Sequence, residues 1–181
     1  MALRVTKSLK EFSAQERLNK MEVDVIDVTI TPDTSAYAVG DLMWRTIEIP
    51  GAVSVPGGSC IIQSVSCIGT STDGDETGAF DIIVTSDSHS HVNADPAIMS
   101  ANDAMSACVS TISDIDGTLG IISITNMTDI GTKCMIGGKG NLGLVGKAES
   151  GSTSLYCWGI SQGTDTWASP SLVLRFGIVK D

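Results

Sequence analysis

Short apolar runs with alternating polar positions recur from Met21 to the end of the chain, separated by clusters of Gly, Pro, Asp, Asn and Ser. Runs of this length, rich in β-branched residues and bounded by turn residues, predict β-strands. The predicted strands are 22–30, 42–49, 59–68, 79–86, 119–125, 132–136, 142–146, 154–161 and 171–179. One short helix is indicated in the same region, at 101–110.

The order of these elements predicts an all-β fold. Helices do not alternate with the strands, which disfavours a parallel α/β sheet. Hydrophobic residues make up 42% of the 181 residues and charged residues 18%, a balance that allows a packed core and excludes a disordered chain. We therefore expect a single-domain β-sandwich over 21–181, with a jelly-roll arrangement as the best fit.

The first twenty residues have a different character. Ser8 and Glu11 have the spacing of a helix capping box, and apolar residues follow at intervals of three to six. This apolar face is too narrow for a stable isolated helix. The pattern indicates an N-terminal arm or short helix over 1–20 that would have to dock on something to be ordered.

The arm, residues 1–20, and the body, residues 21–181, differ in the sign of their net charge. The net charge is −10, yet residues 1–20 hold five basic and two acidic side chains, a net of +3, which leaves −13 for the rest. Such a body should repel phosphate backbones, so we expect no direct contact with nucleic acid. The arm could bind an acidic partner or be a solvated tail, and both interpretations stay open. Its candidate partner-binding residues are Arg4, Lys7, Lys10, Phe12 and Arg17.

The apolar runs are too short to span a membrane, and the N-terminus lacks the apolar stretch of a secretory signal, so we expect synthesis in a cytoplasm.

The cysteines are odd in number, scattered, and without a Cys-x-x-Cys pair. They are interpreted as buried small apolar residues rather than disulfides or zinc ligands. They are Cys60, Cys67, Cys108, Cys134 and Cys157.

A His-x-His pair is the strongest candidate for chemistry. His89 and His91 would share one face of a strand and could hold a metal, with Asp81, Asp87 and Asp95 close by in sequence. The chain has no third histidine, and the glycines and glutamate that accompany this pair in metal-dependent jelly-roll enzymes are absent. We therefore expect a polar surface loop, and no metal, cofactor or catalytic residue.

Two other loops fit functional motifs only in part. Asp73, Asp75 and Glu76 resemble the start of a calcium loop, but the position that needs a glutamate is Val84. The glycine-rich stretch 136–143 lacks the final Lys-Ser/Thr of a phosphate loop. An acidic hairpin tip and a turn between strands explain them better.

The order of several segments resembles a group of small structural proteins of tailed bacteriophages. The matching pattern runs from "SAYAVGD" through "GGSCIIQSVSCI", "AFDIIVTS" and "NA" to the last strand, "LVLRFGIVKD". It covers about 22–181. The resemblance implies a non-enzymatic virion protein, most specifically a capsid cement or decoration protein on the capsid surface. Its implied partner is the major capsid protein, and such proteins often form homotrimers at three-fold axes.

The alternative is a tail, collar or fibre-associated virion protein that binds host glycans. Trp44, Trp158 and Trp167 would then be candidates for stacking on sugars, although core packing is the expectation for each. For the homotrimer, the strands at 154–161 and 171–179 are the predicted contact surfaces, because each has more large apolar residues than one buried face needs.

Overall fold

The computed structural model describes residues 22–32, 34–70, 78–87, 102, 104, 117–125, 127–131, 134–164, 167 and 172–180. These residues form ten β-strands and no helix. The first five strands are β1 (Glu22–Ile30), β2 (Leu42–Ile49), β3 (Ser59–Thr70), β4 (Phe80–Thr85) and β5 (Thr118–Ile124). The others are β6 (Thr128–Gly131), β7 (Cys134–Lys139), β8 (Leu144–Lys147), β9 (Leu155–Ser161) and β10 (Leu172–Lys180).

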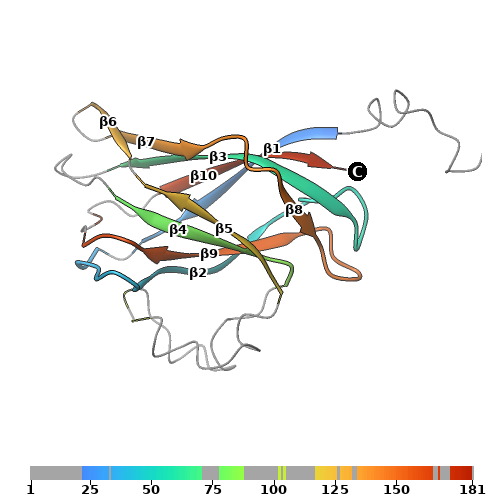
Figure 1. The fold of residues 1–181 in the computed structure, drawn as a ribbon, viewed down its shortest axis with the longest axis horizontal. Coiled ribbons are helices and arrows are strands. Elements are labelled where there is room, and N and C mark those ends of the chain that lie inside the picture. Colours follow the sequence, from blue (N-terminus) through green and yellow to red (C-terminus); the bar gives the residue numbers. More distant parts are fainter. Residues whose placement is uncertain are drawn as a thin grey trace, which may run out of the picture.

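The strands form two sheets that lie face to face (Figure 1). One sheet has the order β1-β10-β3-β7-β6, with β8 also paired to β3, and the other has the order β2-β9-β4-β5. Early strands pair with late strands in reverse order: β1 with β10, β2 with β9, β3 with β7 and β8, and β4 with β5. All these pairs are antiparallel. One long hairpin wrapped across two sheets in this way is a jelly roll, so the predicted all-β, jelly-roll sandwich is confirmed.

β7 and β8 together occupy the place of one strand beside β3. β8 pairs with the first residues of β3, from Ser59 to Ile62, and β7 pairs with Val65 to Thr70. The short loop between them stays attached to β3, because the backbone N–H of Leu142 donates a hydrogen bond to the carbonyl oxygen of Gln63, at 3.0 Å. The two predicted strands at 132–136 and 142–146 are therefore one interrupted strand in the fold.

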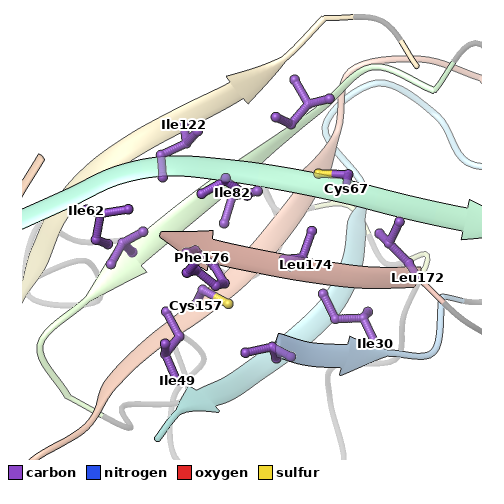
Figure 2. Packing of buried hydrophobic residues seen from close by; sticks show 14 of the residues in the cluster. Ile30, Ile49, Ile62, Cys67, Ile82, Ile122, Cys157, Leu172, Leu174 and Phe176 are labelled. Carbon is purple, nitrogen blue, oxygen red and sulfur yellow. The ribbon is translucent and has the colours of Figure 1, made fainter. Parts of the chain in front are cut away.

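The core lies between the sheets. Strand alternation directs every second side chain of β10 inward, from Leu172 through Leu174 and Phe176 to Ile178, all fully buried. Figure 2 shows Leu172, Leu174 and Phe176 packed with Ile62 of the neighbouring strand β3 and Ile82 of the facing strand β4. Edge-to-face ring contacts join Trp44 to Phe80 and Phe80 to Trp167, with centroids 5.6 and 6.1 Å apart. A modest number of aromatic residues thus supports a continuous core.

Two predictions fall largely outside the described residues. The arm at 1–20 lies there completely; the first described strand begins at Glu22. Of the helix predicted at 101–110, only 102 and 104 are described. Asn102 has a φ of 77°, and Ala104 forms an isolated antiparallel bridge with Asp41, so neither residue is helical. In the part of the chain that the structure describes, no helix is long and apolar enough to cross a membrane.

Candidate functional site: an exposed apolar sheet face

The predicted polar loop around the histidines is described only at its start. His89, His91 and Asp95 lie outside the described residues. Asp81 is on β4 and accepts a hydrogen bond from the side-chain amide of Gln162, at 2.8 Å, whereas Asp87 is buried two residues past the end of the same strand. The described residues hold no cluster of three His, Cys, Asp or Glu side chains that could bind a metal. Asp73, Asp75 and Glu76 also lie outside them.

Three cysteines behave as predicted. Cys60, Cys67 and Cys157 are buried and not in disulfides. Burial raises the pKa of the Cys67 and Cys157 thiols to about 12, so both stay protonated and unreactive at neutral pH. Cys134 is an exception, because it lies exposed at the start of β7, and Cys108 is outside the described residues.

All three tryptophans are buried, and core packing is confirmed for Trp44 and Trp167. Trp44 and Trp167 belong to the main core between the sheets, on either side of Phe80. Trp158 is buried on the other face of β9, beside Ile83 of β4. A sugar would need an exposed aromatic ring to stack on, and none of these rings offers one.

The two strands predicted to form subunit contacts lie in the middle of their sheets. β9 runs between β2 and β4, and β10 between β1 and β3. β9 directs Leu155 into the core and Trp158 to its other face, and β10 directs four large apolar residues into the core. β10 nevertheless turns Val173 and Val179 outward, where both are half-buried. These two valines belong to a larger apolar surface.

That surface is the outer face of the first sheet. Its main feature is a row of four residues that are paired directly across four strands: Val23 of β1, Val179 of β10, Ile61 of β3 and Val145 of β8. Directly paired residues point to the same side of a sheet. Val23 is 75% exposed and Val145 is 63% exposed. We call this set the outer apolar row.

A polar row crosses the middle of the same face. The guanidinium of Arg175 donates two hydrogen bonds to the carboxylate of Asp27, at 2.8 and 2.9 Å, and this contact lowers the pKa of Asp27. Ser66 and Gly138 continue the row on β3 and β7. The row therefore has two charged side chains on one half and two small residues on the other.

A second, mostly apolar row lies beyond the polar one. Thr29, Val173, Ile68 and Ile136 are paired across β1, β10, β3 and β7, and Ile136 is exposed. Lys147 is the one further charge that these strands place on the outer face, beside Ser59. On a chain with a net charge of −10, this face has one carboxylate, already paired, and two cations.

The candidate partner-binding residues of the arm, Arg4, Lys7, Lys10, Phe12 and Arg17, lie outside the described residues. The apolar face was not predicted as a site, but β1 has a signal for it. In "EVDVIDVTI" the apolar positions are 23 and 25, then 26, 28 and 30. The alternation changes phase at Ile26, which means that this strand has apolar side chains on both faces.

No family model and no curated protein matches the chain in sequence. Among solved structures, it is similar to a chain of Cocksfoot mottle virus, with 10% identity over 99% of this chain and 91% of that one, at a TM-score of 0.36. It is also similar to a chain of Desmodium yellow mottle tymovirus, with 13% identity over 97% and 94%, at a TM-score of 0.29. At these scores the assignment of the jelly roll rests on the strand pairing of the chain itself.

Proposed function

We propose that this chain is a non-enzymatic structural protein of a virus particle. The observation that carries the proposal is the outer apolar row on a jelly-roll sheet. Monomeric soluble proteins rarely expose a continuous apolar surface unless another molecule covers it. Jelly rolls occur in viral capsid and lectin domains and in enzymes with a cavity between the sheets. In this chain the space between the sheets is filled by apolar side chains, and its indole rings are buried.

The more specific proposal is a cement or decoration protein on the outside of a tailed-bacteriophage capsid. It rests on the resemblance in segment order and on the charge division between arm and body. In this proposal residues 1–20 reach a neighbouring major capsid subunit, since twenty extended residues span up to about 70 Å. A homotrimer would match a three-fold site of the shell and make three weak contacts act together. A glycan-binding tail protein has less support because all three tryptophan side chains are buried.

Particle binding of charge-matched variants tests this proposal. The test variant carries Lys7→Ala and Lys10→Ala in the arm, and its control carries Arg45→Ala and Lys139→Ala, two exposed cations of the body. Both variants lose two positive charges. We expect the arm variant to bind undecorated capsids of the encoding virus about tenfold or more weakly, and the control to bind like the wild type. Equal binding of all three proteins would refute the role of the arm, and no binding by the wild type would refute the function.

A further inference from the structure

The outer face of the β1-β10-β3-β8 sheet has the properties of a surface that packs against the same surface of a second copy. The outer apolar row has the order Val23, Val179, Ile61, Val145. Its midpoint lies between β10 and β3. Its two ends are valines of similar exposure, and its two central residues are half-buried and apolar. We propose that a second copy of this chain packs face to face on this surface.

A two-fold axis parallel to the strands, between β10 and β3, makes the contact self-complementary. It places Val23 of one copy on Val145 of the other, and Val179 on Ile61. In the second row it places Val173 on Ile68. Apolar residues therefore meet apolar residues along the whole outer apolar row and at the centre of the second row, as they do between sheets packed face to face inside a domain. At the ends of the second row Thr29 faces Ile136.

The polar row fits the same axis. Arg175 of one copy meets Ser66 of the other, and Asp27 meets Gly138. Each charged side chain thus faces a small residue, and no charge faces a charge of its own sign. Asp27 and Arg175 keep their mutual ion pair within one copy, so neither is left unpaired in the contact. This compatibility favours a second copy over an unrelated partner.

The distribution of charge also favours a second copy of the chain as the partner. Two copies that each have a net charge of −10 repel one another through most of their surface. Here the strands β1, β10, β3, β7 and β8 present only Asp27, Arg175 and Lys147 outward, a net of +1. Copies can approach through this face without an excess of carboxylates between them.

The contact is small. Four strands at about 4.8 Å spacing and about seven residues at roughly 3.4 Å give a footprint of roughly 20 by 24 Å. A footprint of this size is typical of weak, transient interfaces, so association of the free protein should depend on concentration. The contact is independent of shell attachment and can coexist with a three-fold contact made by other surfaces.

Charged substitutions at the two ends of the outer apolar row, Val23 and Val145, test the proposal. Sedimentation of the full-length protein up to about millimolar concentration measures the association. Val23→Glu alone, and Val145→Lys alone, should weaken the association about tenfold or more, so that the limiting mass falls by half. The double variant with both changes should recover it, because each glutamate then faces a lysine of the other copy. Within one copy the two positions are three strand spacings apart, about 14 Å, too far for an ion pair.

Val39 provides the matched control, because it is also 63% exposed but lies in the turn before β2. Val39→Glu alone should associate like the wild type, and Val39→Glu combined with Val145→Lys should stay dissociated. Equal melting temperatures would show that all variants fold. Wild-type protein whose mass does not change with concentration, or a double variant that is not rescued, would overturn the contact. Particle binding measured on the same variants is a separate readout, so failure of the function and failure of the contact are distinguishable.

Discussion

At the scale of single residues, the fit of Trp44 against β9 is the tightest constraint in the core. Trp44 of β2 is paired with Gly159 of β9, and a Cβ added at Gly159 would overlap the indole ring. The glycine is required by this contact and not by its backbone conformation, because its φ is not in the left-handed region. The position could not be found from the sequence, since the ring and the glycine are 115 residues apart.

Gly159→Ala is therefore expected to destabilise the protein by about 1–3 kcal/mol, the usual cost of overpacking a core. Gly140→Ala is the control, because no atom lies within 4 Å of a Cβ built there; its effect should stay within about 0.5 kcal/mol. Chemical denaturation measures both. Equal stability of the two variants would contradict the packing of Trp44.

The free thiols provide a second measurement at this scale. Cys67 and Cys157 should resist alkylation in native protein at pH 8, because burial raises the pKa of both thiols to about 12 and only the thiolate reacts. Exposed Cys134 should react readily. Peptide mapping after brief labelling separates the sites. Labelling of Cys157 as fast as that of Cys134 would show that the two sheets open easily.

At the scale of elements, the strands were largely predictable and their partners were not. The predicted strands at 22–30 and 42–49 coincide with β1 and β2, and the others agree within a few residues. β6 was missed because its four residues, "TDIG", are all exposed and carry no alternation. The outer apolar row takes one residue from each of four strands, and only the register of the strand pairs brings them together.

The position of β1 allows a prediction about the arm. β1 pairs with β10 through nine residues, from Glu22 to Ile30, and these pairs do not involve residues 1–20. Deleting 1–20 should leave a cooperative thermal transition with a melting temperature close to that of the full chain. Circular dichroism during heating measures it. A non-cooperative melt would mean that the arm is an integral part of the sandwich and not a separate binding element.

At the scale of the whole molecule, the charge distribution suggests how copies meet. Most of the surplus carboxylates are outside the face formed by β1, β10, β3 and β8, which leaves that face apolar and nearly neutral. The sequence predicted contacts through the last two strands, but both lie inside their sheets, and the side chains they leave partly accessible include Val173 and Val179 of β10 and Ile160 of β9. Charge repulsion elsewhere would keep contacts between copies weak until a shell brings them close together.

The most direct test of the central claim is a three-dimensional reconstruction of the virus particle encoded with this chain. Density for the jelly roll is expected on the outside of the shell at three-fold positions, with the outer apolar row of each copy packed against a second copy. Isolated monomers on the shell would contradict the trimer, and a five- or six-fold ring at the tail would contradict the capsid location. Particles without the chain would contradict the structural role itself.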